Sequence, residues 1–158
     1  MEARALTSIL GYTWFGADLS PHARERLAAV GRVVDLPAGA VVVQEGKPCE
    51  AMGVVLDGRV ALRLAVPGLG DRTILTVESG DVFGWSAAFA APTATSTCVT
   101  TTPTTAILFE REGLLAALEA DPVLGAAVYR RLLGALSRRL SATRMQLLDL
   151  YRTAVEPW

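Results

Sequence analysis

The sequence predicts a mainly β fold with flanking helices, and three observations lead to this class. Seven or eight short β-branched runs lie between residues 32 and 109, separated by turn signals such as "PAG", "EGKP" and "ESGD". Sequence patterns typical of helices precede and follow that segment. The chain of 158 residues, 51% of them hydrophobic, is long enough to bury one sizeable core. Strands at this spacing indicate an antiparallel sandwich or barrel rather than a parallel sheet.

The N-terminal segment, residues 1–31, is predicted to be helical. In "GADLSPHARERLAAVG", Ser20 can cap a short helix, Pro21 suits its first position and Gly31 ends it. The strand segment, residues 32–109, follows directly. Within it we expect Asp57-Gly58 to form a hairpin turn, because glycine tolerates the positive φ that such a turn requires.

The C-terminal segment, residues 110–152, is predicted to contain two helices before a tail at residues 153–158. The first is short and ends near Asp121, and Pro122 begins a long one that runs to about Arg152. We take residues 1–158 as a single domain built from these segments.

The long helix carries an unbroken heptad pattern, with residues spaced alternately by three and four. A second apolar line, including Val128, Leu132 and Leu148, can contact the β segment. We therefore predict that one face packs on the domain and the other forms a homodimer, the alternative being a wide stripe packed inside a monomer. The heptad begins at Ala126, and its predicted dimer contacts are Tyr129, Leu133, Leu136, Leu140, Thr143, Leu147 and Leu150.

Charge and hydropathy argue against nucleic acid and membranes as partners. A net charge of −1 gives no bulk electrostatic attraction to either. No apolar run approaches the roughly 18 residues of a spanning helix. The start, "MEARALTSIL", lacks the layout of a secretion signal. We therefore expect a cytoplasmic protein.

Residues for enzymatic or metal chemistry are missing from the sequence. His22 is the sole histidine, and we expect it at the surface or in a cap rather than on a metal. No nucleophile elbow, phosphate-binding loop or catalytic Cys/His pair is found. Cys98 falls in a strand-like run and is expected to be a buried reduced thiol, although one bridge with Cys49 stays open. We expect neither enzymatic activity nor a bound metal.

In their order and spacing these elements resemble the cyclic-nucleotide-binding domain, as in the effector domain of the catabolite activator protein. The resemblance extends over roughly residues 15–151. The stretches that carry it are "FGADLSPHARERLA", "LPAGAVVVQEGKP", "GVVLDGRVAL", "ESGDVFGWSAAF" and "ALEADPVLGAAVYRRLLGALSRRL". It implies an eight-stranded antiparallel β-roll, jelly-roll-like, with a short internal helix and a long C-terminal helix. It also implies a stand-alone regulatory or sensor module.

The resemblance places a ligand site in "FGWSAAFAAPTATSTCV", where an Ala-Pro loop separates a glycine turn from a run of hydroxyl residues. Gly84 matches the family's turn glycine, and Ser96 matches its small hydroxyl residue. Trp85 stands in place of the acid that binds the ribose, and Thr95 in place of the arginine that binds the phosphate. Thr143, with Arg144 beside it, falls near the hydroxyl of the long helix that reaches the purine. The predicted ligand-binding residues are Gly84, Trp85, Ser86, Thr95, Ser96, Thr97 and Thr143.

Losing two charged hydrogen bonds, each contributing about 1.5–3 kcal/mol, predicts cyclic-nucleotide binding weaker by roughly two to four orders of magnitude. No basic residue near the site in the sequence replaces the arginine. Three interpretations stay open. The roll can bind a less charged effector with Trp85 against a flat ring, or bind cyclic nucleotide weakly. Alternatively, Trp85 fills the cavity of a ligand-free structural or protein-interaction dimer.

Output partners are harder to infer. DNA-binding relatives carry a helix-turn-helix after the long helix, whereas only "TAVEPW" follows here, so we expect no direct DNA binding. A sensor of this kind would signal to a separate protein that the sequence does not identify. We expect the arginines of the long helix to form a solvated face. They are Arg130, Arg131, Arg138, Arg139, Arg144 and Arg152.

Overall fold

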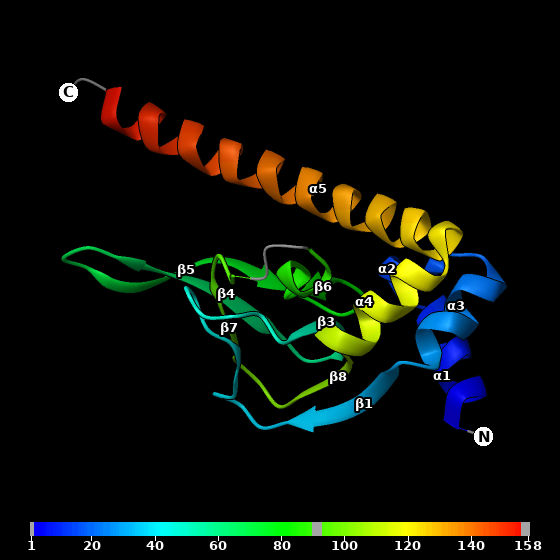
Figure 1. Cartoon of the computed structure of the whole chain (residues 1–158). Helices are drawn as coiled ribbons and strands as arrows, with labels where there is room; N and C mark the ends of the chain where they lie inside the picture. The colour runs from blue at the N-terminus through cyan, green and yellow to red at the C-terminus, as the bar shows by residue number, and fades with distance from the viewer. Residues whose placement is uncertain (1, 90–92, 156–158) are drawn as a thin grey trace.

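The computed structural model describes residues 2–89 and 93–155. The predicted Ala-Pro loop at residues 90–92 and the end of the predicted tail, residues 156–158, lie outside the described residues. A roll of short strands forms the centre of the molecule, helices from the N-terminal segment gather at one end of it, and the last helix runs along one side (Figure 1).

The strands confirm the predicted fold class. Over the described residues, eight strands form two four-stranded sheets, in the orders β1-β8-β3-β6 and β2-β7-β4-β5, and all the recorded pairs are antiparallel. Phe15, Phe83 and Phe109 are fully buried in the core. The strands are β1 (Gly31–Leu36), β2 (Val41–Val43), β3 (Ala51–Asp57), β4 (Val60–Val66), β5 (Gly70–Val77), β6 (Val82–Phe83), β7 (Thr97–Thr100) and β8 (Thr104–Glu110).

The N-terminal segment holds more helix than predicted. Its elements are α1 (Glu2–Gly11), α2 (Trp14–Ala17) and α3 (Pro21–Ala28), whereas the sequence predicted one helix. The predicted cap is confirmed, since Ser20 Oγ accepts a hydrogen bond from the backbone amide of Ala23 at 3.1 Å. The predicted helix end was wrong: α3 stops at Ala28, and Gly31 already begins β1.

The predicted hairpin at Asp57-Gly58 was also wrong. β3 and β4 belong to different sheets, so this turn carries the chain from one sheet to the other. Gly58 does have the expected positive φ, 95°, and a Cβ there would lie 2.5 Å from the carbonyl oxygen of Pro103. The hairpin of this region joins β4 to β5, with positive φ at Gly68 and Gly70.

The C-terminal helices follow the prediction closely. α4 (Arg111–Ala120) leads into α5 (Pro122–Val155), which extends slightly beyond the predicted end at Arg152. Asp121 Oδ1 accepts a hydrogen bond from the amide of Leu124 at 3.1 Å, which satisfies one of the free donors at the start of α5. In the described part of the chain, no helix is long and apolar enough to cross a bilayer.

Candidate functional site: the interior of the roll beneath α5

The short internal helix that the resemblance implies is a single 3-10 turn, η1 (Trp85–Ala88), at the end of β6. Gly84 precedes it in the left-handed conformation, with φ 67° and ψ 30°. A Cβ at this position would lie 2.5 Å from the carbonyl oxygen of Ala51. Both the φ value and the close approach require glycine here, so the turn that opens η1 depends on this residue.

Beside this turn lies a small cavity of about 10 Å³. A volume of about 10–15 Å³ holds roughly one water molecule, so this cavity as described has no room for a larger ligand. Side chains from β2, η1 and β7 and the loops between them fill the space. The lining residues are Val43, Cys49, Gly84, Trp85, Ser86, Ala94, Thr95, Ser96 and Cys98.

Five of the seven predicted ligand-binding residues line this cavity, namely Gly84, Trp85, Ser86, Thr95 and Ser96. Thr97 and Thr143 lie outside its lining. Thr97 Oγ1 accepts a hydrogen bond from the amide of Glu45 at 3.0 Å and so joins the β2 side to β7. The Thr143 hydroxyl donates to the carbonyl of Arg139 at 2.9 Å, within its own helix.

The two C-terminal helices hold the far end of η1. Arg111 Nη1, at the start of α4, donates to three carbonyl oxygens of this segment. Tyr129 of α5 donates its hydroxyl hydrogen to Ala88 at 2.8 Å and stacks on Phe89. The segment of η1 is therefore bound by hydrogen bonds to both α4 and α5. The acceptors of Arg111 are Ser86, Ala87 and Phe89, at 3.4, 2.9 and 2.8 Å.

Arg139 of α5 covers the aromatic wall of the site. Its guanidinium carbon lies 4.5 Å from the centroid of the Trp85 ring, a cation–π arrangement, and the residue is only 9% exposed. Nη2 donates to the carbonyl of Val82 and lies 3.7 Å from Asp81 Oδ1. Burial lowers the pKa of Arg139 from its ordinary value, and the charge of Asp81 opposes that shift.

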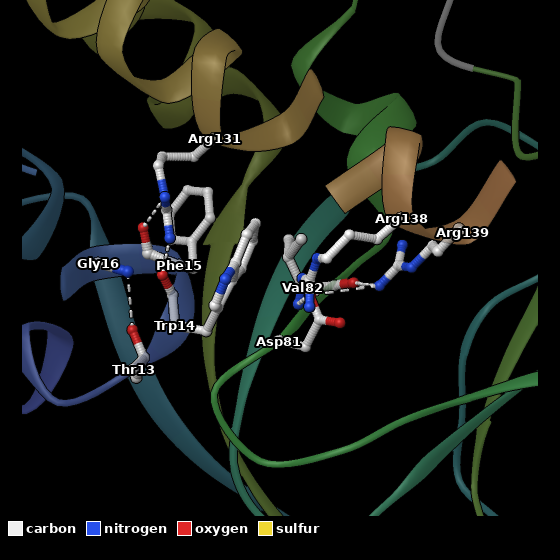
Figure 2. A network of polar contacts seen from close by, with 9 residues as sticks. All are labelled: Thr13, Trp14, Phe15, Gly16, Asp81, Val82, Arg131, Arg138 and Arg139. Carbon is white, nitrogen blue, oxygen red and sulfur yellow. Dashed lines mark hydrogen bonds and ion pairs between the residues drawn. The ribbon is translucent and has the colours of Figure 1, made fainter. Parts of the chain in front are cut away.

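The neighbouring arginines pack on the N-terminal helices (Figure 2). Trp14 lies within cation–π distance of two of them, at 4.1 Å from Arg131 and 3.6 Å from Arg138. Arg138 also pairs with Asp81 at 3.2 Å. The predicted solvated face was therefore wrong for Arg131 and Arg139. Both side chains pack on the domain, where they donate hydrogen bonds to backbone carbonyls and lie over tryptophan rings.

Sequence reasoning missed Arg139 as a residue of the site. Its position along the helix could have revealed it. The buried residues of α5 recur every three or four positions, and Arg139 is the next position in that pattern. The solvated face was predicted because the arginines are spread around the helix and the overall charge of the chain is balanced. The series is Leu124, Val128, Leu132, Ala135 and Arg139.

The remaining candidates behave as simple structural groups. Cys49 and Cys98 are free and buried, as predicted for Cys98, and burial raises the pKa of the Cys98 thiol to about 12. His22 is largely exposed and pairs with Asp121 at 3.2 Å, in agreement with a surface role. Among the described residues, no group of His, Cys, Asp and Glu side chains could hold a metal ion.

A β-roll with an internal glycine-turn site, closed by a long C-terminal helix, defines a class of small-ligand regulatory domains. A family model of the cyclic nucleotide-binding domain matches residues 33–121. The chain belongs to this family. The predicted resemblance is thereby confirmed.

Known relatives agree with this assignment. The chain is 28% identical, over 137 residues, to the CRP-like cAMP-activated global transcriptional regulator of Mycobacterium tuberculosis; the match covers 87% of this chain but 59% of the regulator. Two solved structures share the fold. One is a cyclic nucleotide-binding domain from Methylobacillus flagellatus, with 24% identity, a TM-score of 0.78, and coverage of 93% of this chain and 83% of that one. The other is a putative cyclic nucleotide-binding protein from Geobacter metallireducens, with 21% identity, a TM-score of 0.74, and coverage of 89% and 98%.

Proposed function

We propose that this chain is a ligand-sensing regulatory module, in which a small molecule binds inside the roll and α5 transmits its presence to a partner. The observation that carries the proposal is the contact between the site and the helix. Trp85 lines the cavity and Arg139 of α5 lies on its ring at 4.5 Å. A ligand that moves Trp85 must therefore also move a buried side chain of α5.

The size of the cavity makes this coupling obligatory. Small-molecule sites commonly enclose roughly 300–1,000 Å³, whereas the interior of the roll offers about 10 Å³. Entry of a ligand requires the pair of Trp85 and Arg139 to open. Binding would then select a conformation of the roll more open than the one described here.

Two classes of ligand fit the site residues. One is a cyclic nucleotide bound weakly, since the domain family is named for that ligand and the mycobacterial relative is named as cAMP-activated. The other is a less charged effector that places a flat ring on Trp85. Thr95 and Ser96 offer hydroxyl groups to either, and we infer no enzymatic step.

The direct test is thermal denaturation of the full chain with cyclic AMP, cyclic GMP, adenosine and a panel of flat neutral compounds. A ligand present at a hundred times its Kd adds about 2.7 kcal/mol to the free energy of unfolding. We expect at least one compound to raise the unfolding midpoint. Absence of any shift at millimolar concentration would contradict the sensor function.

A second function is favoured by the closed cavity itself: a structural or protein-interaction dimer module whose roll is filled by Trp85. Trp85→Ala separates the two. In a filled module the variant loses stability, by less than the about 3–5 kcal/mol of a fully buried tryptophan because Trp85 is only half-buried, and no ligand stabilises it. In a sensor the same variant changes the affinity for the ligand of the wild type.

A designed variant tests the position of the site more strictly. Trp85→Glu combined with Thr95→Arg restores the acid and the arginine that the family resemblance places here, and we expect it to strengthen cyclic AMP binding. Arg139 would lie close to the new carboxylate and would partly compensate its burial. Calorimetry on the folded double variant, with each single variant as control, measures the gain. An unchanged affinity would count against this assignment of the pocket.

The output of the module is proposed to pass through a homodimer. Most of the predicted dimer contacts are exposed in the single chain, including Leu133, Leu140, Leu147 and Leu150. Leucine side chains contribute about 1.5–3 kcal/mol each when removed from water. A second copy of α5 would cover this face and would relay the opening of the site to a separate protein.

A further inference from the structure

Arg139 is a buried cation that is only partly satisfied among the described residues: Nη2 donates to the carbonyl of Val82 and lies near Asp81, but its other nitrogen atoms do not share these contacts. Its Nε and Nη1 atoms are both inaccessible to solvent, and neither has a hydrogen-bond partner within the described residues. Buried polar groups in folded proteins are nearly always paired, and a buried charged donor without an acceptor is strongly unfavourable. A position of this kind calls for an acceptor that the ligand-free chain does not provide.

Within residues 2–89 and 93–155, the carboxylate recorded beside Arg139 is that of Asp81, and it is already engaged. Asp81 Oδ1 already accepts from the amide of Val82 at 2.8 Å and pairs with Arg138 at 3.2 Å, while Arg139 is farther away at 3.7 Å. Three donors thus converge on a single oxygen atom. The opposite side of the guanidinium meets the Trp85 ring, which attracts a cation but accepts no strong hydrogen bond.

The guanidinium of Arg139 lies against Trp85, a residue of the cavity wall, although Arg139 is not itself among the lining residues. Trp85 and Cys98 both line the cavity, and Arg139 is close enough to each to stack on the first and to influence the thiol of the second. Thr95, where the family resemblance expects an arginine, also lines this cavity. A cation is therefore present beside the site, but α5 supplies it rather than the roll.

We propose that Arg139 is the anion-recognising residue of this roll, and that it hydrogen-bonds an oxyanion of the ligand, a phosphate or a carboxylate, with its unpartnered Nε and Nη1 groups. This inference rests on the proposed function and specifies the ligand as an anion. It also gives α5 a direct part in binding, because the residue that holds the ligand's charge belongs to the helix that transmits the signal.

Arg138 provides a matched control. It is the adjacent residue of the same helix and shares Asp81 with Arg139, but its guanidinium lies over Trp14 (Figure 2), whereas that of Arg139 lies over Trp85. Removing either charge changes the net charge of the chain by the same amount and removes a cation from beside Asp81, and Arg138 is the nearer of the two. Only the Arg139 substitution removes a donor from the site.

The experiment measures the affinity of the full chain for cyclic AMP and for adenosine, which has the same base and sugar but no phosphate. We expect Arg139→Gln to weaken cyclic AMP by about ten- to hundred-fold, the value of one charge-assisted hydrogen bond. Adenosine should bind both proteins alike, and Arg138→Gln should bind cyclic AMP like the wild type. Inorganic phosphate and acetate, compared with chloride at equal ionic strength, show whether phosphate or carboxylate is preferred.

The outcomes separate the two proposals. Equal cyclic AMP affinity in wild type and Arg139→Gln, or equal loss in Arg138→Gln, would overturn the role of Arg139 and leave the sensor function intact. If the wild-type protein binds adenosine but no anion, the role of Arg139 is likewise overturned and the sensor function is left intact. If neither the nucleosides nor the simple anions bind, the sensor function fails and this inference with it. Should Arg139→Gln not fold, Arg139→Lys keeps the charge without the planar fork, and an unchanged cyclic AMP affinity in that variant would equally overturn the proposal.

Discussion

The two halves of α5 have similar leucine content but different surroundings. In the first half, residues 122–139, a line of side chains at three- and four-residue spacing is buried against the domain, ending at Arg139. In the second half, residues 140–154, every side chain is exposed, although Leu140, Met145, Leu147 and Leu150 are apolar. Periodicity alone shows that a helix has an apolar face. It does not show whether that face meets the same chain or another.

This difference assigns the two halves separate tasks. In the proposed sensor the first half would report on the roll, because Tyr129 and Arg139 contact η1 and the residues around it. The second half is free to contact a partner helix. A change in the roll would thus reach the partner along one continuous helix of 34 residues.

The largest expected effect tests the packed half. Leu132 is 1% exposed and its neighbour Leu133 is 66% exposed. We expect Leu132→Ala to lower the free energy of unfolding by about 2–5 kcal/mol, as for other buried leucines. Leu133→Ala removes the same atoms from the exposed face and should lower it by less than about 1 kcal/mol in the monomer. Urea denaturation of both variants, in a dilute sample, measures the difference.

An equal loss in the two variants would contradict the division of α5 into a packed face and a free face. A larger loss for Leu133→Ala that grows with protein concentration would instead show that the dimer supplies much of the stability of the chain.

The next effect tests the unpacked half. Leu140→Glu places a charge in the centre of the predicted seam, and we expect the dimer to dissociate at least about 100-fold more readily, equivalent to about 2.7 kcal/mol. Ser141→Glu adds the same charge to an adjacent exposed position outside the seam and should leave assembly unchanged. Analytical ultracentrifugation at micromolar concentration compares the three proteins. A monomeric wild type, or a dimer that tolerates Leu140→Glu, would exclude this interface.

Several features of this comparison were predictable from sequence. The strand segment, the cap at Ser20 and the helix start at Pro122 depend on short-range signals, and all three were confirmed. The sequence also indicated two apolar faces on α5. Gly84 was assigned from the family resemblance, and its positive φ in the structure gives the physical reason for a glycine there.

The features that were missed depend on contacts between distant residues. Arg139 is buried because Val82, Asp81 and Trp85, more than 50 residues earlier, provide an acceptor, a counter-charge and a ring. Its spacing along α5 is the one local signal, and the contacts that bury it cannot be inferred from the local sequence. The turn at Gly58 was assigned the wrong type for a similar reason. Positive φ at glycine suits both a hairpin and a crossover between sheets, and only the pairing of distant strands separates the two.

A smaller effect is expected where the packed half begins. The pKa of Asp121 lies below its ordinary value of 3.8, mainly because the carboxylate accepts from the amide of Leu124 and secondarily because it pairs with His22. A lowered pKa in the folded state means that the charged carboxylate stabilises the fold above pH 3.8, and that this contribution is lost as the pH falls through the folded value. Asp121→Asn, which keeps the capping oxygen, should unfold at a lower temperature than the wild type at pH 6, and the difference should shrink as the pH falls below 3.8. A difference that persists at low pH would show that the charge is not responsible.

The smallest effect belongs to the end of the unpacked half. Arg152 lies 4.0 Å from Asp149 one turn earlier, with 84% of its side chain exposed. Exposed ion pairs of this kind lose side-chain entropy and are screened by salt, so they contribute little. We expect Arg152→Ala to change neither the unfolding midpoint nor the dimer affinity measurably, whereas Arg131→Ala, which removes hydrogen bonds to the carbonyls of Trp14 and Phe15, should lower the midpoint. A loss of dimer affinity in Arg152→Ala would place the partner helix beyond Leu150 and would extend the interface past the predicted seam.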